Sequence, residues 1–188
     1  MSTTASPQAM PRARRETILA WLGEVMDPEV PVVSVLDLGI VRDVQWQDDA
    51  GPPSRQASLL VTVTPTYSGC PATEVIAQSI RSTLRAHGVD QVEVRTQLSP
   101  AWTTDWMTHK GREALRAYGI APPVLRATGA GNTQAIDISA LMSNRVVVPC
   151  PLCASRKTRL LSQFGSTACK ALYQCNDCLE PFDYFKPH

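Results

Sequence analysis

The sequence has no large excess of charge of either sign: 18 Lys or Arg residues stand against 17 Asp or Glu residues, and the net charge is +1. Without a basic excess, long-range attraction to nucleic-acid phosphates or anionic lipids is weak. The chain also lacks the roughly 20 consecutive apolar residues of a membrane-spanning helix, and its first residues lack the apolar centre of a signal peptide. We therefore expect a cytoplasmic protein that binds neither membrane nor nucleic acid.

Histidine is scarce, and familiar catalytic motifs are missing. The three histidines, His87, His109 and His188, lie far apart and form neither a triad pattern nor an HExxH pair. The sequence has no glycine-rich phosphate loop, and it offers no obvious cofactor site or set of acid and base groups. We expect a protein that is not an enzyme, with a thiol-based oxidoreductase or an electron-transfer subunit of an oxygenase as the alternative.

Periodic patterns in the first hundred residues predict a small α+β domain. An amphipathic helix continues until Asp27-Pro28, and a strand follows at about residues 40–46. A turn rich in Asp, Gly and Pro leads to an alternating strand at residues 59–64, so these two strands should form a hairpin. A helix over residues 75–84 and a strand over residues 92–98 then predict a right-handed crossover and a parallel pair in one mixed sheet.

Composition divides the chain into three parts. Residues 1–120 hold the α+β pattern, which ends in a short helix around residues 110–118. Residues 121–145 are rich in small residues and have no clear period, which is typical of a flexible linker. Residues 146–188 contain five of the six cysteines. The predicted fold is therefore α+β, a small mixed sheet with helices, followed by a separate cysteine-rich module.

Two CxxC pairs dominate this last module. Cys150 and Cys153 form the first pair, and Cys175 and Cys178 form the second after a gap of 21 residues. Each pair can make a knuckle in which two thiolates converge, and two knuckles complete a tetrahedral shell. Few apolar residues surround them, so a bound metal would supply the stability of the module. We predict a zinc ribbon, and an iron–sulfur cluster on the same thiolates is the main alternative.

A zinc ribbon could also bind nucleic acid. Residues 147–188 carry five Lys or Arg against three Asp or Glu, and the four thiolates cancel that excess. Nucleic-acid recognition needs a basic face with stacking aromatics. We keep a nucleic-acid-binding ribbon only as a third alternative.

Cys70 lies in the string SGCP, where the second strand passes into a helix. With Pro71 as the first helical residue, Cys70 is expected at the N-cap, where the positive helix end would lower the pKa of its thiol. Asp27, Glu29 and Asp37 could join it in a mixed sulfur and oxygen site for iron. The alternatives are a small apolar residue at a turn for Cys70 and turn formation for each carboxylate.

Trp102 and Trp106 flank Asp105 in the string AWTTDWM. Such a pair of large aromatics can contact a partner protein, but it can equally close a hydrophobic core. Both interpretations stay open at this point.

Several long strings resemble the PaaD family of the bacterial phenylacetate degradation pathway: DPEVP, DLGIVRDV, PTYSGCPAT, SPAWTTDWM, FGSTACKALYQC and EPFDYFK. The resemblance covers residues 27–186. The N-terminal part is similar to the small α+β domain of SufT-type iron–sulfur cluster assembly factors, in which the DPE, DLG and Cys-Pro elements recur.

The resemblance implies a non-catalytic accessory factor of the multicomponent phenylacetyl-CoA epoxidase, the 1,2-phenylacetyl-CoA monooxygenase of aerobic aromatic catabolism. Its partners would be the di-iron oxygenase or the iron–sulfur flavin reductase, and its cargo would be iron or a transient iron–sulfur cluster. Cys70 with Asp37 would be the transfer site, and the ribbon would dock on a partner.

Two features are left open by the resemblance. Relatives often have a cysteine just after the final Phe-Lys, where this chain has Pro187, so Cys169 has no expected thiol partner there. An exposed sheet edge would also allow a homodimer.

Overall fold

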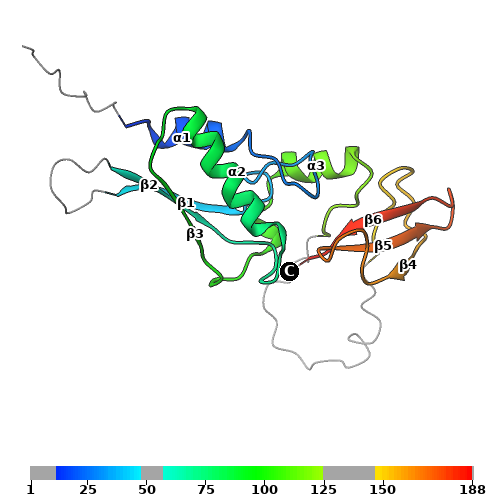
Figure 1. The fold of residues 1–188 in the computed structure, drawn as a ribbon. Helices are drawn as coiled ribbons and strands as arrows, with labels where there is room; N and C mark the ends of the chain where they lie inside the picture. The colour runs from blue at the N-terminus through cyan, green and yellow to red at the C-terminus, as the bar shows by residue number, and fades with distance from the viewer. Residues whose placement is uncertain (1–11, 48–56, 125–146, 188) are drawn as a thin grey trace, which may run out of the picture.

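The computed structural model describes residues 12–47, 57–124 and 147–187, and within these ranges the chain forms two small sheets (Figure 1). The first sheet, with its helices, makes up one end of the molecule, and the second sheet makes up the other end (Figure 1). No helix within the described ranges is long and apolar enough to span a membrane. The α+β class and the separate C-terminal sheet agree with the prediction.

The first sheet has the predicted mixed topology. Its strands are β1 (Val41–Gln47), β2 (Ser58–Val63) and β3 (Val92–Thr96), in the order β1-β2-β3. β1 pairs with β2 in antiparallel fashion, and β2 pairs with β3 in parallel. The central strand is the most apolar, and Leu59 and Val61 are fully buried because both of its edges are paired.

Two helices cover this sheet, α1 (Arg15–Leu22) and α2 (Ala72–Ala86). α2 buries Ile76, Ile80 and Leu84, which recur every four residues and so share one face. It ends before Gly88, whose φ of 87° places it in the left-handed region that glycine adopts without strain.

The first helix ends earlier than predicted. The apolar pattern predicts a helix as far as Asp27, but α1 stops at Leu22. Beyond it, the Val35 amide donates to the Val25 carbonyl at 2.9 Å, and the Asp27 amide donates to the Val33 carbonyl at 2.9 Å. These pairings hold residues 25–35 as a compact loop, so the apolar residue Val25 is buried without being helical.

A third helical region follows β3. It consists of the short 3-10 helix η1 (Thr104–Trp106) and the helix α3 (His109–Ala117), close to the predicted range. The Thr108 hydroxyl caps α3 by accepting a hydrogen bond from the Gly111 amide at 3.0 Å.

The second sheet contains β4 (Thr158–Ser162), β5 (Lys170–Cys175) and β6 (Pro181–Phe185), all antiparallel, with β5 in the centre. Its own core is small and consists of Ala121, Val148, Cys150, Ala171, Cys175, Phe182 and Tyr184. Two of these seven residues belong to the CxxC pairs. A core of this size agrees with the expectation that the module depends on a metal cross-link.

The two sheets are joined through Ala121, the first residue of the predicted linker. Its amide donates to the Asp183 carbonyl at 2.8 Å, and its carbonyl accepts from the Phe185 amide at 2.9 Å, so Ala121 extends the edge of β6. Phe185 is buried in the core of the first domain, with its ring centroid 6.1 Å from that of Trp102. Residues 125–145 of the predicted linker lie outside the described residues.

Candidate metal centre and thiol pocket

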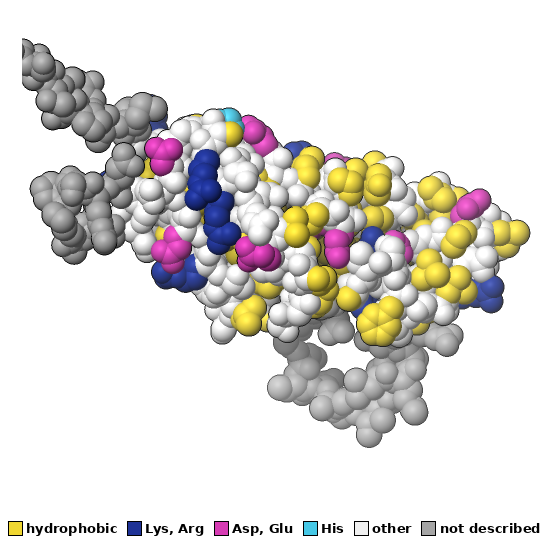
Figure 2. All heavy atoms as spheres, viewed as in Figure 1, with side chains coloured by type: hydrophobic (Ala, Val, Ile, Leu, Met, Phe, Trp, Pro, Cys, Tyr) yellow, Lys and Arg dark blue, Asp and Glu magenta, His cyan; other side chains and the backbone are white. Residues whose placement is uncertain are grey.

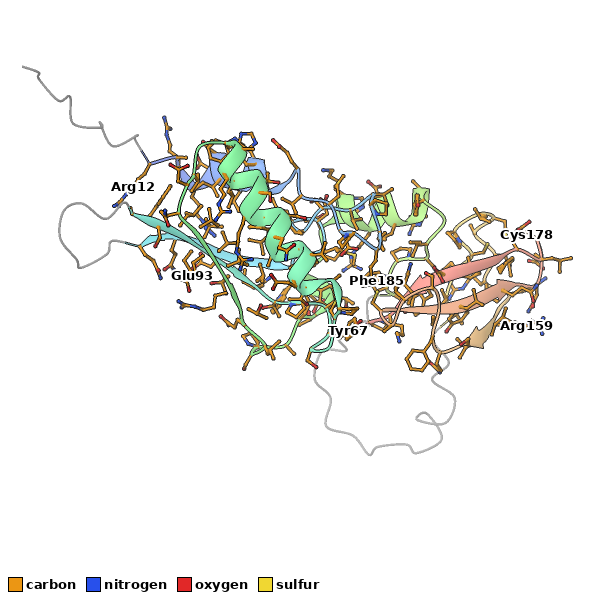
Figure 3. All side chains as sticks on the ribbon, in the orientation of Figure 1. Arg12, Tyr67, Glu93, Arg159, Cys178 and Phe185 are labelled. Atoms are coloured by element: carbon orange, nitrogen blue, oxygen red, sulfur yellow. The ribbon has the colours of Figure 1, made fainter. Side chains whose placement is uncertain are left out.

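The four cysteines of the two CxxC pairs come together at one end of the second sheet. Cys150 and Cys153 lie just before β4, Cys175 ends β5, and Cys178 lies in the turn before β6. All four Sγ atoms are within 4.8 Å of one another. Figure 3 shows Cys178 at the end of this sheet that points away from the rest of the molecule. The structure therefore brings together the four residues that the spacing predicted.

The sulfur positions fit a tetrahedral metal centre. The Cys150 and Cys178 Sγ atoms are 3.8 Å apart, and the Cys153 and Cys175 Sγ atoms are 3.5 Å apart. A regular tetrahedron with metal–sulfur distances of about 2.3 Å has sulfur–sulfur edges of about 3.8 Å. The arrangement therefore leaves room for a zinc-sized ion without rearrangement of the backbone.

Backbone amides favour the thiolate form at this centre. The Cys178 amide lies 3.4 Å from the Cys175 Sγ and donates to it, as expected for a CxxC knuckle. This bond is the largest cause that lowers the pKa of Cys175 to about 6. A thiolate is the form that binds metal, so the knuckle prepares its own ligand.

A second group of functional side chains lines a pocket where the two domains meet. Asp27, Glu29 and Cys70 come from the N-terminal domain, and Cys169 comes from the residue just before β5. The free space is about 10 Å³, close to what one water molecule needs. Figure 3 shows Phe185, which also lines the pocket, at the junction of the two sheets. Cys70 therefore faces carboxylates as predicted, and also a thiol that the sequence did not connect with it.

The pKa of Cys70 does not follow the sequence-based expectation. The structure places Pro71 at the N-cap, so Cys70 lies just outside α2. Burial is the largest cause and raises the pKa of the Cys70 thiol; the Ala72 amide lowers it, and the Glu29 carboxylate raises it further. The expected lowering was wrong because the desolvation of a half-buried thiol outweighs the helix end. Without a metal, Cys70 is a neutral thiol.

The two carboxylates of the DPE string have different roles. Asp27 Oδ1 accepts hydrogen bonds from the Glu29 amide at 2.8 Å and from the Val30 amide at 2.9 Å, which fixes the turn. Glu29 is half-buried, and its Oε2 accepts a long hydrogen bond from the Cys169 Sγ at 3.8 Å. Asp27 thus shapes the loop, and Glu29 presents a carboxylate beside a thiol.

Cys169 is held firmly at the edge of this pocket. The Thr167 hydroxyl oxygen lies 3.0 Å from its Sγ, and its carbonyl accepts from the Lys186 amide at 2.9 Å. Burial is the largest cause that raises the pKa of its thiol. The neighbouring Lys170 is buried and forms an ion pair with Asp183 at 3.3 Å. Neither Cys169 nor Lys170 carries a local motif that could have predicted a place in the pocket.

Asp37 lies elsewhere, and this corrects its assignment to the Cys70 site. Its Oδ2 accepts from the Ser34 hydroxyl at 2.7 Å, and its Oδ1 accepts from the Thr108 hydroxyl at 3.1 Å. These hydrogen bonds outweigh burial and lower the pKa of Asp37. A Cβ on Gly111 would lie 2.7 Å from the Asp37 carbonyl oxygen, so α3 packs directly on this turn. Asp37 ties the DLG turn to α3.

The tryptophan pair is divided between core and surface. Trp102 is only 3% exposed and donates from its Nε1 to the Leu38 carbonyl at 2.9 Å. Trp102 is therefore a core residue, and the interpretation of it as a partner contact was wrong. Trp106 is half-buried beneath the Arg42 guanidinium, which lies 3.4 Å from its ring centroid, and Asp105 is exposed.

Comparison with known families finds two matches in this chain. The model of the family described as "PaaD zinc beta ribbon domain" matches residues 136–186, which include all four clustered cysteines. The model described as "Iron-sulfur cluster assembly protein" matches residues 15–95, which include the DPE and DLG strings and Cys70. The two matches fall on the two sheets of the structure.

Individual relatives show the same division. The chain is 45% identical over 186 residues to a protein of Escherichia coli (strain K12) that is named as one component of a "Putative 1,2-phenylacetyl-CoA epoxidase", covering 99% of this chain and 97% of that protein. It is 32% identical over 107 residues to the "Fe-S protein maturation auxiliary factor YitW" of Bacillus subtilis (strain 168), covering 56% of this chain and 97% of that protein. A solved structure from Bacillus anthracis, described as a domain of unknown function DUF59, is 27% identical with a TM-score of 0.45; the match covers 53% of this chain and 89% of that one.

Proposed function

Because the chain belongs to the PaaD family, we propose that it is an accessory factor that helps to mature the metal centres of a multicomponent phenylacetyl-CoA epoxidase. The full-length similarity to a protein named as an epoxidase component supports the client. The similarity of the N-terminal domain to maturation auxiliary factors of Fe-S proteins supports metal or cluster assembly as the task. In this proposal the protein acts in the cytoplasm and has no catalytic activity of its own.

The observation that carries the proposal is the pocket of the N-terminal domain. Cys70 and Glu29 line it, and both are half-buried, so they remain within reach of solvent. A thiolate and a carboxylate together suit iron, and a partly exposed ligand pair can release what it holds. Iron, alone or in a cluster, is the cargo in this proposal and not a permanent component.

The ribbon has a different part in the proposal. Zinc, held by Cys150, Cys153, Cys175 and Cys178, stabilises the module; the tetrahedral fit of the sulfur atoms supports this choice. Residues 1–120 act as the assembly domain, residues 121–145 as the linker and residues 146–188 as the ribbon.

Exposed hydrophobic side chains on the ribbon support a docking role towards an epoxidase component. They are Leu152, Leu160, Leu161, Phe164 and Leu179, each more than 40% exposed. Figure 2 shows hydrophobic side chains gathered over the end of the molecule that β4, β5 and β6 form. Apolar surface of this kind is typical of protein interaction sites.

Co-expression tests this function. The epoxidase components are produced in a host without a related factor, either alone, with the wild-type chain or with a Cys70→Ser variant. We expect the wild-type chain to raise the epoxidase activity and the iron content of its components, and the Cys70→Ser variant to leave both at the level without the factor. A Glu24→Gln variant, which alters an exposed carboxylate paired with His87, is the matched control and should act like wild type. Full epoxidase activity without the chain would contradict the proposal.

A further inference from the structure

We propose that Cys169 of the ribbon and Cys70 of the N-terminal domain bind one divalent, thiophilic metal ion between them, with Glu29 as a third ligand; in the cell this ion is ferrous iron. The inference rests on the proposed function and deepens it, because it makes the ribbon part of the cargo site. A metal bound there would report the docking of one domain on the other.

The fold brings the three ligands to one place. Cys70, Cys169 and Glu29 line one small pocket, although Cys169 lies 140 residues after Glu29 in the chain. The Cys169 Sγ and the Glu29 Oε2 are already 3.8 Å apart. The free space of about 10 Å³ is enough for one ion or one water molecule and not for a cluster.

The ligands are not yet closed around an ion. Among the described residues, the ribbon cysteines are the group whose ligand atoms already meet the geometry of a metal centre. Cys70 and Glu29 are half-buried and can rotate, whereas Cys169 is buried and held by Thr167 and Lys186. We therefore expect binding to move the two N-terminal side chains onto a fixed thiol.

The charge balance of the pocket also favours a divalent ion. Burial keeps both thiols protonated without a metal. When a divalent ion binds, each thiol loses one proton to solvent, so two negative charges form as two positive charges arrive. The net charge of the pocket does not change, and the desolvation cost of isolated thiolates is avoided. Sulfur ligands with one carboxylate favour a soft or borderline ion over magnesium or calcium.

The strand β5 connects this pocket to the zinc centre. Cys169 directly precedes β5 and Cys175 ends it, so the two sites are about 20 Å apart at about 3.3 Å per residue. The pairing of β5 with β6 keeps Cys169 in place, and the ribbon metal stabilises that pairing. Loss of zinc is therefore expected to weaken the pocket as well.

Cobalt(II) is a suitable probe because its thiolate complexes absorb in the near ultraviolet and visible ranges. The full-length protein is first loaded with one zinc under anaerobic conditions, since zinc binds the ribbon more tightly than cobalt does. Cobalt(II) is then titrated in, and the absorption of a second site is followed. We expect one cobalt per chain, with thiolate bands whose intensity matches two sulfur ligands.

The variants separate the ligands. Cys70→Ser and Cys169→Ser should each weaken cobalt binding by more than about 100-fold and remove part of the thiolate absorption, since even outer-shell changes cost about 10–100-fold. Glu29→Gln should weaken binding at least about 10-fold, and the matched control Glu24→Gln should not. Retention of one zinc and an unchanged melting temperature verify the fold of each variant; if Cys169→Ser fails this check, Glu29→Gln and Cys70→Ser still test the site.

Two results would overturn the inference. Cobalt binding to Cys169→Ser with wild-type affinity and wild-type thiolate bands would show that the ribbon does not contribute a ligand. No second cobalt site in the wild-type protein would remove the metal site altogether. Neither result alone refutes the maturation role, which the co-expressed epoxidase reports separately through its activity and iron content.

Discussion

The contact between the ribbon and the N-terminal domain can be tested at a single side chain, Phe185. This residue belongs to the ribbon strand β6 but is only 2% exposed and packs in the core of the other domain. Replacing a buried Phe by Ala costs about 3–5 kcal/mol, because burial is lost and a cavity remains. We expect Phe185→Ala to lower the free energy of unfolding by this amount, and the Tm by about 10 °C for a chain of this size.

Urea unfolding followed by tryptophan fluorescence is the appropriate assay, since Trp102 lies directly beside Phe185. The matched control is Phe164→Ala, which truncates the same side chain at a position that is 68% exposed and should cost less than about 0.5 kcal/mol. Both variants should keep one zinc, because neither residue contacts the cysteine cluster. Equal stability of the two variants would refute the packing of the ribbon on the N-terminal core.

Three further predictions concern individual groups. Elemental analysis of anaerobically purified protein should find about one zinc per chain in wild type and in Cys70→Ser, and none in Cys175→Ser/Cys178→Ser; iron and sulfide lost with the double variant would instead indicate a cluster at the ribbon. Asp37→Asn should lower the free energy of unfolding by about 1–3 kcal/mol at neutral pH, because a buried carboxylate loses its hydrogen bonds; since the folded pKa of Asp37 is lowered, wild type should lose this advantage as the pH falls below about 4, and a variant cost that does not change with pH would contradict it. Alkylation of Cys70 in protein without metal in the pocket, monitored by mass spectrometry, should reach half its maximal rate at a higher pH than free cysteine, whose pKa is about 8.5; a lower midpoint would mean that the helix end prevails after all.

The sequence predicted best where the signal was local. Two CxxC pairs fix the identity of four ligands because each knuckle is formed by residues close together in the chain. The hairpin and the parallel crossover likewise followed from alternation and from one amphipathic helix. In such segments the nearest neighbours in sequence determine the geometry.

Long-range packing explains what the sequence could not predict. Asp37 resembled a ligand because it is acidic and lies near the DPE string, but its partner Thr108 comes from the N-cap of α3, 71 residues later. Cys169 has no motif of its own, and its place beside Glu29 depends on how β5 and β6 pack on the other domain. Trp102 could have been surface or core by pattern alone, and only the packing around Phe185 decides it.

Direct transfer of iron tests the central claim of a maturation factor most closely. The zinc-loaded chain is charged with ferrous iron under anaerobic conditions, freed of excess metal, mixed with iron-depleted epoxidase components and separated from them again. Iron should move to an epoxidase component from the wild-type chain and restore its activity, whereas Cys70→Ser should carry and deliver none above background. Equal reconstitution by Cys70→Ser, or by the same amount of free ferrous iron, would contradict the account.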